Sequence, residues 1–348
     1  MSSTSPKTSN WLLGLLAVVA LGAGAVAFVG IEGSGDAGNK LPQQFQYDLA
    51  QYMEVDPKLV AFHEVARWPL DLEQPRAVAV AEGGTLVIVG DKALLRLSGE
   101  GALLKTLALE GEPLSVAAAG SNHVYPGRIY VGLTDHVETF DGDKRVAVWA
   151  REGLVSVLTS IAVARNDVFV ADAGERIVWR YDTEGKKLGR IGDRDEARDV
   201  RGFSIPSPYF DCAIGPNELL HVVNPAYHRI ESFTFDGYPG PRWGKAGMQI
   251  EAFSGCCNPS NIAIFADGRV VTAEKGLPRV KVYSPEGEFE SVVVGPKVLA
   301  PGAAALDETR DEHRLQPVDV AVRGDGTIFV LDPLAKCVRV YQPNEQAN

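Results

Sequence analysis

The sequence predicts an all-β fold, a six-bladed β-propeller that follows one N-terminal apolar segment. The first observation is composition, since 36 Gly and 21 Pro among 348 residues indicate many turns and disfavour a helical bundle. The second is a phrase of the form Pro-x-x-φ-Ala-φ, with φ apolar, which recurs along the chain. The third is that each recurrence opens a unit of about 40–50 residues with four short apolar runs, which is typical of a propeller blade.

Residues 11–31 carry no charge and form the predicted transmembrane segment, behind a cytoplasmic tail at residues 1–10. About 20 apolar residues span a bilayer, and Lys7 before the segment predicts an N-terminus that stays in the cytoplasm. The alternative is a cleaved signal peptide, because residues 23–25 and 25–27 resemble small-residue cleavage sites. We favour a single-pass anchor in the cytoplasmic membrane, since apolar residues continue beyond both sites. Either way, the rest of the chain is expected to be periplasmic or otherwise extracytoplasmic, and secreted if cleavage occurs.

The remaining chain divides into a linker, one domain and a tail. Residues 32–58 are expected to be a Gly-rich linker with one short helix near residues 44–55, where apolar residues recur at helical spacing. The propeller is expected at residues 59–342, followed by a short tail at 343–348.

Six units carry the repeated phrase. It starts at Pro75, Pro113, Leu158, Pro208, Pro259 and Pro317. In the fourth unit, Cys212 is expected at the position where the other units have Ala. In the last four units, a second β-branched run ends in a polar residue, namely Asp172, Asn224, Glu274 and Asp332.

The sixth unit ends after three strands, near Tyr341, so the ring lacks one strand. An open ring would leave unpaired strand edges. The apolar run at residues 59–67 precedes the first unit, and we expect it to pair as the outer strand of the last blade.

The repeat also resembles the NHL-repeat family of six-bladed propellers. The resemblance rests on residues 168–177, 219–230 and 243–259, where a Gly-spaced turn is followed by Phe and then Pro. It implies the fold and leaves the function open, because similar propellers bind proteins, bind RNA, or carry lyase and hydrolase sites. In related propeller lyases, His residues from different blades hold a zinc ion.

Strand direction places the loop into the first strand and the loop out of the second strand of every blade on one face, here called the top face. Three long connections, at residues 192–206, 244–258 and 296–316, belong to it, and such loops often build binding surfaces. The residues predicted to bind a ligand there are Phe203, Tyr209, Asn224, His228, Trp243, Cys256, Cys257, Asn258, Glu274, Lys275 and Asp332.

The cysteines leave several interpretations open. Cys256 and Cys257 are adjacent, and they fit structural disulfides or buried thiols, a vicinal disulfide at the rim, or redox and soft-metal chemistry. The presence of Cys212 is explained if it is buried in its strand as a small residue. The redox state and the pairing of Cys212, Cys256, Cys257 and Cys337 stay open.

Recurring acidic and basic residues have a structural interpretation. The pairs Asp172 with Arg176 and Glu274 with Arg279 recur with the repeat, so we expect them to tighten blades and not to catalyse. Lys275 has no counterpart in other units, and a solvated surface Lys is the simplest interpretation.

The histidines do not predict a metal site. No HExxH motif and no helical His pair is present. His228 and His313, with Glu274 or Asp332, could together hold one divalent ion. We predict no metal ligand and no cofactor, with a divalent ion as the remaining alternative.

Two functions from different classes follow. The net charge of −11 disfavours nucleic acid as a partner. The first hypothesis is a binding or scaffold propeller, tethered to the inner membrane through residues 11–31, that engages a protein or other extracytoplasmic ligand through its top face. The alternative is a propeller enzyme, a lyase or hydrolase with a divalent metal at the channel mouth, although no catalytic residue can be assigned.

Overall fold

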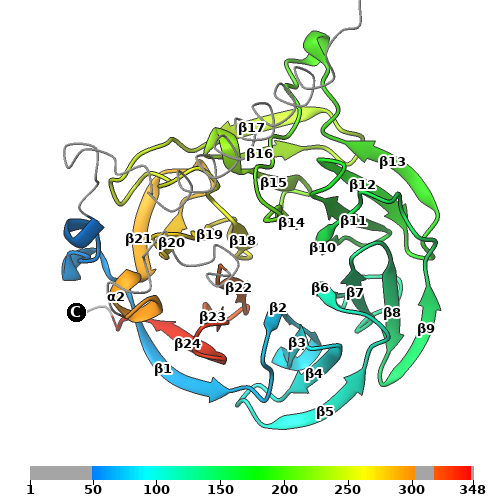
Figure 1. Cartoon of the computed structure of the whole chain (residues 1–348), viewed down its shortest axis with the longest axis horizontal. Helices are drawn as coiled ribbons and strands as arrows, with labels where there is room; N and C mark the ends of the chain where they lie inside the picture. The colour runs from blue at the N-terminus through cyan, green and yellow to red at the C-terminus, as the bar shows by residue number, and fades with distance from the viewer. Residues whose placement is uncertain (1–48, 302–316, 346–348) are drawn as a thin grey trace, which may run out of the picture. The chain divides into compact units, whose positions relative to one another are not determined.

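The computed structural model describes residues 49–301 and 317–345, and Figure 1 shows six sheets arranged as a ring. All six sheets lie in one compact unit, residues 50–348, and each has four strands. The predicted all-β six-bladed propeller is therefore confirmed. The predicted tail at 1–10, the apolar segment at 11–31 and most of the linker lie outside the described residues. Within the described part of the chain, no helix is long and apolar enough to cross a membrane.

The blades use the strands in chain order, except the last. Blade 1 contains β2 (Pro75–Val80), β3 (Leu86–Gly90), β4 (Ala93–Leu97) and β5 (Leu103–Ala108). Blade 2 contains β6 (Pro113–Ala118), β7 (Ile129–Leu133), β8 (Val137–Asp141) and β9 (Lys144–Val148). Blade 3 contains β10 (Leu158–Val163), β11 (Asp167–Asp172), β12 (Ile177–Asp182) and β13 (Lys187–Ile191). Blade 4 contains β14 (Cys212–Ile214), β15 (Leu220–Asn224), β16 (Arg229–Phe233) and β17 (Pro239–Trp243). Blade 5 contains β18 (Asn261–Ile264), β19 (Val270–Ala273), β20 (Val280–Tyr283) and β21 (Phe289–Val294). Blade 6 contains β22 (Asp319–Val322), β23 (Ile328–Asp332), β24 (Cys337–Pro343) and β1 (Phe62–Pro69).

The helical segments are short. They are the 3-10 turns η2 (Leu49–Tyr52), η3 (Pro57–Leu59), η4 (Glu82–Gly84), η5 (Glu196–Arg198) and η6 (Pro225–Tyr227), and the α-helical turn α2 (Pro296–Leu299). Where a helix was expected near residues 44–55, the described part holds only the single turn η2.

The sixth sheet combines strands from both ends of the chain. Its order is β1-β24-β23-β22, and β1 pairs antiparallel with β24 from Phe62 opposite Pro343 to Pro69 opposite Cys337. The strand begins three residues later than the run at 59–67, because Val60 and Ala61 instead lie against β21 of blade 5, where the Ala61 amide donates to the Val292 carbonyl at 3.1 Å.

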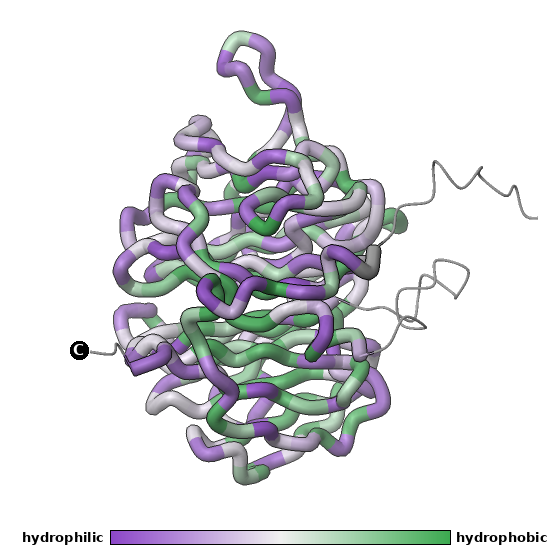
Figure 2. Tube along the Cα trace, turned by 90° about the vertical axis from the view of Figure 1, so that its left-hand side faces the viewer, coloured by the Kyte–Doolittle hydropathy of each residue, from purple (hydrophilic) through white to green (hydrophobic). Residues whose placement is uncertain are grey.

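Burial follows the position of a strand in its blade. The second strands β3, β7, β15 and β23 are buried at every residue, because both of their faces pack against neighbouring blades. The outer strands β5 and β9 are mostly exposed. Figure 2 shows runs of hydrophobic residues along the strands and hydrophilic residues at many of the turns. Full burial of Leu86 or Ile88 contributes about 1.5–3 kcal/mol each, so the second strands hold much of the core.

The structure corrects the alignment of the fourth unit. Cys212 pairs with Val222 as Ile161 pairs with Val170, so Cys212 occupies an apolar φ position. Ala213 takes the Ala position, because Pro208 stands one residue earlier in its unit than the other prolines do.

Candidate functional site

The first strands of all six blades line a central cavity of about 310 Å³. In each of these strands, the residue directly before the first apolar position φ of the repeated phrase stands at an equivalent place in the pairing with the second strand. Ser160, for example, lies opposite Ala171, and Asp319 lies opposite Leu331. We call this the ring position. It is occupied by Ala77, Ser115, Ser160, Asp211, Asn261 and Asp319.

Polar side chains at the ring position join each blade to the next. Ser160 Oγ accepts a hydrogen bond from the Cys212 amide at 3.2 Å, and Asp211 Oδ2 accepts one from the Ile262 amide at 2.6 Å. Asp319 Oδ2 accepts from the Val78 amide at 2.8 Å. This last bond connects blade 6 to blade 1, so the innermost strands of the last and the first blade of the ring are also linked.

Two of these carboxyl groups are buried close to each other. Burial raises the pKa of Asp211 to about 7, with the negative charge of Asp319 adding to the rise. Burial also raises the pKa of Asp319, although the Val78 amide and the Asn261 amide group, which donates at 2.8 Å, favour its charged form. The cavity wall below the mouth therefore carries carboxyl groups that are already hydrogen-bonded by the protein.

Above the ring, side chains from blades 1, 4 and 5 converge at the mouth of the cavity on the top face. The Lys275 amine lies 4.9 Å from the centre of the Tyr209 ring. Arg76 lines the cavity, and its charge lowers the pKa of the Tyr209 hydroxyl, which burial raises by a larger amount. We call Arg76, Tyr209 and Lys275 the mouth cluster.

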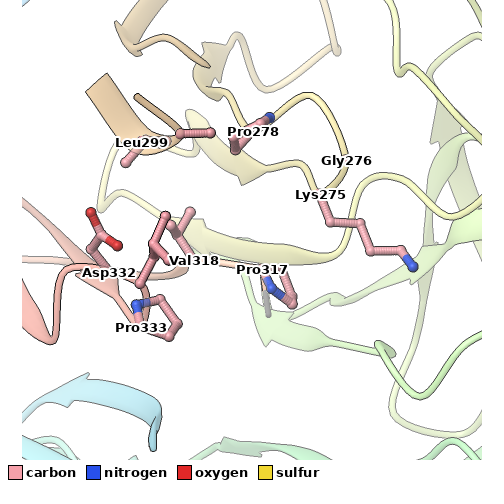
Figure 3. A pocket seen from close by; sticks show the side chains of 10 residues that line it. Lys275, Gly276, Pro278, Leu299, Pro317, Val318, Asp332 and Pro333 are labelled. Atoms are coloured by element: carbon pink, nitrogen blue, oxygen red, sulfur yellow. The ribbon is translucent and has the colours of Figure 1, made fainter. Parts of the chain in front are cut away.

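Figure 3 shows how Lys275 leaves its loop. Its side chain extends away from Asp332 and Pro333, which line a small cavity between blades 5 and 6 together with Leu299 and Pro317. That cavity has a volume of about 20 Å³, room for roughly one water molecule. Lys275 also lines this cavity, but its amine points away from Asp332 and lies over the ring of Tyr209 instead.

The loop that carries the adjacent cysteines is held rigidly beside the mouth cluster. Asn258 Nδ2 donates to the carbonyls of Ser254 and Lys275 at 2.6 and 2.9 Å, and its Oδ1 accepts from the Lys275 amide at 2.8 Å. Cys256 is exposed and Cys257 is 3% exposed, and their Sγ atoms are 3.0 Å apart. All four cysteines are free thiols in this structure. The hydrogen bond shared between the two thiols and burial raise the pKa of Cys256, which keeps this thiol neutral near pH 7.

His228 supports the same loop. Its Nε2 lies 2.5 Å from the Gly255 carbonyl, one residue before the cysteine pair. The structure brings His228, Cys256, Cys257, Asn258 and Lys275 to one loop region, and their contact with a ligand stays a prediction.

Three other predicted residues lie inside the blades. Asn224, Glu274 and Asp332 are each at most 1% exposed, and each contacts the residue seven positions later on the third strand. Glu274 lies 2.6 Å from Arg279 and 2.8 Å from Lys281. Burial alone would raise the pKa of Glu274, but these two cations outweigh it and lower the pKa. The geometry is that of ion pairs that hold a blade together.

Asp172 occupies the equivalent position in blade 3 without its expected partner. Its carboxylate accepts hydrogen bonds from the amides of Val157, Gly174 and Glu175 and from the Trp179 indole. The predicted pair with Arg176 is absent, because backbone donors of the turn and the loop saturate the carboxylate instead.

The side chains of Phe203 and Trp243 pack within and between blades and do not form the predicted binding surface. Phe203 is 7% exposed and packs against the ring of Phe210 at 5.1 Å. Trp243 is half-buried and lies on Gly287, where an added Cβ would come within 2.3 Å of the indole. Trp68 and Trp149 lie on glycines of the next blade in the same way, so Trp243 belongs to a repeated contact between blades.

A metal site was the alternative interpretation of the histidines and carboxylates. Among the described residues, no group of three or more His, Cys, Asp or Glu has the geometry to hold a metal ion. Glu274 is committed to its two cations, and His313 lies outside the described residues.

Sequence reasoning missed three residues of this region, Arg76, Asp211 and Asp319. A signal was present for Asp211 and Asp319, because the residue before φ is polar in five of the six units; Arg76 stands outside this position. The shifted alignment of the fourth unit obscured it, since it placed Asp211 at the φ position.

The fold and the channel mouth define the chain as a six-bladed β-propeller with polar groups gathered at one end of its channel. No protein-family model matches the sequence, and no curated protein matches it. The resemblance to NHL-repeat propellers therefore stays a prediction beyond the fold itself.

Solved structures are similar in fold. One is described as a streptogramin B lyase, with a TM-score of 0.54 and 12% identity over 82% of this chain and 98% of that one. Another is a catalytically inactive variant of the virginiamycin B lyase from Staphylococcus aureus with quinupristin, with a TM-score of 0.52 and 13% identity over 79% and 83% of the two chains. At this identity the likeness establishes the fold alone.

Proposed function

We propose that this protein is a binding propeller, tethered outside the cytoplasmic membrane by residues 11–31, that takes its ligand at the channel mouth on the top face. The observation that carries the proposal is the mouth cluster, in which Lys275 lies over the ring of Tyr209 from the neighbouring blade. Both side chains are half-buried, and they come from loops rather than from the repeated core of the blades.

The rigidity of the surrounding loop supports a binding role. Asn258 holds the backbone of Lys275 with two hydrogen bonds and donates a third to the Ser254 carbonyl. Glu274 accepts from the amide and hydroxyl of Ser254 on the other side. A site whose side chains are fixed before the ligand arrives loses little conformational entropy on binding. The buried residues of the predicted site thus support the mouth instead of contacting the ligand.

The test is capture of a ligand from a cell-envelope extract by the full-length chain in detergent. Tyr209→Ala and Lys275→Ala are expected to abolish capture. Lys144→Ala is the matched control, because Lys144 is an exposed cation on the outer strand β9. Capture that is unchanged in both mouth variants would remove the channel mouth as the site.

The second candidate is a propeller enzyme, a lyase or hydrolase. The observation in its favour is the likeness of the fold to structures described as lyases. It is the weaker candidate, because Glu274 is buried in ion pairs and His228 is bonded to its own supporting loop. Stoichiometric divalent metal in the purified full-length chain, lost in His228→Ala, would favour the enzyme over the binding module.

A further inference from the structure

We propose that the ligand of the channel mouth presents an anionic group, a carboxylate or a phosphate of a small soluble molecule, to Arg76 and Lys275. This inference rests on the proposed function and names the chemistry of the same site. It starts from the charges of the described residues, most of whose lysines and arginines pair with carboxylates.

Arg76 and Lys275 differ from the other cations that form no ion pair within residues 49–301 and 317–345. The others are all exposed, and they are Lys58, Lys144, Arg165, Arg176, Lys186 and Arg201. Arg76 and Lys275 are half-buried, and Tyr209 connects them. Arg76 lines the channel and acts on the Tyr209 hydroxyl, and the Lys275 amine lies 4.9 Å from the centre of the same ring. A cation that has lost part of its hydration without gaining a counter-charge is destabilised, and a bound anion would remove that cost.

The polar contacts of the two side chains leave most of their donors open. Among the described residues, Arg76 donates one side-chain hydrogen bond, to Gln74 Oε1 at 2.7 Å. The Lys275 amine has the face of Tyr209 beside it, and within the described residues the Tyr209 hydroxyl makes no hydrogen bond. A guanidinium, an ammonium and a phenol hydroxyl together form a set of donors that suits a carboxylate or phosphate.

Within residues 49–301 and 317–345, no carboxylate forms an ion pair with Arg76 or Lys275. Asp211 and Asp319 lie along the cavity below, where their oxygens already accept backbone amides at 2.6 and 2.8 Å. The Cys256 thiol beside Lys275 is kept neutral by its raised pKa. The ligand is expected to be small and soluble, because a chain with a net charge of −11 is repelled by an anionic membrane surface.

The test is isothermal titration calorimetry of the full-length chain in a neutral detergent, with inorganic phosphate and with citrate as probes. The expected result is saturable binding of at least one probe that weakens as sodium chloride is raised, since salt screens charges. Loss of one charge-assisted contact is expected to weaken binding by about tenfold to a hundredfold in Arg76→Ala and in Lys275→Ala. Tyr209→Phe, which removes only the hydroxyl, is expected to have a smaller effect.

Lys144→Ala is the matched control and is expected to bind as the wild type does. Absence of binding of both probes up to about 10 mM would overturn the inference. Equal affinity in the wild type, Arg76→Ala and Lys275→Ala would also overturn it, as would binding only to phosphatidylglycerol vesicles. If the probes fail while Tyr209→Ala still abolishes capture from the extract, the anionic ligand is refuted and the binding site at the mouth stands.

Discussion

Replacement of Asp319 by Ala tests the ring of bonds that joins the blades. The carboxylate accepts hydrogen bonds from the Val78 amide, the Val320 amide and Asn261 Nδ2, at 2.8, 2.9 and 2.8 Å. Each buried donor left without a partner costs about 1–3 kcal/mol. Removal of a buried carboxylate next to Asp211 offsets part of that loss, because burial raises the pKa of both groups. We expect the free energy of unfolding to fall by about 2–4 kcal/mol.

The measurement is urea unfolding of the full-length chain at pH 7, followed by tryptophan fluorescence. Ser115→Ala is the matched control, since Ser115 occupies the ring position of blade 2 and makes one bond, to the Leu158 carbonyl at 3.2 Å. Its loss is expected to cost about 1 kcal/mol or less. Amide hydrogen exchange is expected to increase at Val78 and Val320 in Asp319→Ala. A cost no larger than that of Ser115→Ala, with unchanged exchange at Val78, would refute the role assigned to Asp319.

Three further predictions concern stability. The folded-state pKa of Asp211, about 7, lies above the unfolded value near 4, so the folded state binds the proton more tightly and its stability falls as the pH rises between these values. Asp211→Asn should abolish this part of the pH dependence in urea unfolding from pH 4 to 7. A pH dependence of the unfolding free energy that is unchanged in Asp211→Asn would disprove the assignment. Glu274→Gln leaves Arg279 and Lys281 buried without a counter-charge and should cost about 3–5 kcal/mol by urea unfolding, whereas a loss below about 1 kcal/mol would contradict the ion-pair interpretation. Phe203→Ala should cost about 3–5 kcal/mol in the same assay and leave ligand capture intact in the folded fraction, and a lost capture with unchanged stability would return Phe203 to the binding surface.

Repetition made the fold predictable from the sequence. A short strand alone is ambiguous, but six copies of one phrase with three further runs each specify a ring. The last blade also followed from this count, since a run before the first unit was available and β1 pairs with β24. Boundaries were less certain, as at Val60, where contact with β21 delays the start of β1.

The sequence could predict the face of the propeller on which the candidate site lies, but not which side chains form the site. Strand direction placed Tyr209 and Lys275 on the top face, and the structure puts them in contact. Strand direction could not separate the half-buried Lys275 from the fully buried Glu274 beside it, because adjacent residues at a strand end point in different directions. No sequence pattern singled out Arg76, because only the three-dimensional ring brings blade 1 close to Tyr209 of blade 4.

The rate at which a thiol reagent modifies Cys256 tests the binding site at the mouth most directly. Cys256 is exposed beside Lys275, while Cys212, Cys257 and Cys337 are buried, so Cys256 should react before the other three cysteines of the folded chain. The assay is run at a mildly alkaline pH after reduction, because the raised pKa of Cys256 leaves little thiolate near pH 7. Addition of the cell-envelope extract is predicted to slow alkylation of Cys256 in the wild type and to leave its rate unchanged in the Tyr209→Ala variant. Alkylation of Cys256 at the same rate with and without the extract, while the wild type still captures its ligand, would contradict a ligand seated at the channel mouth.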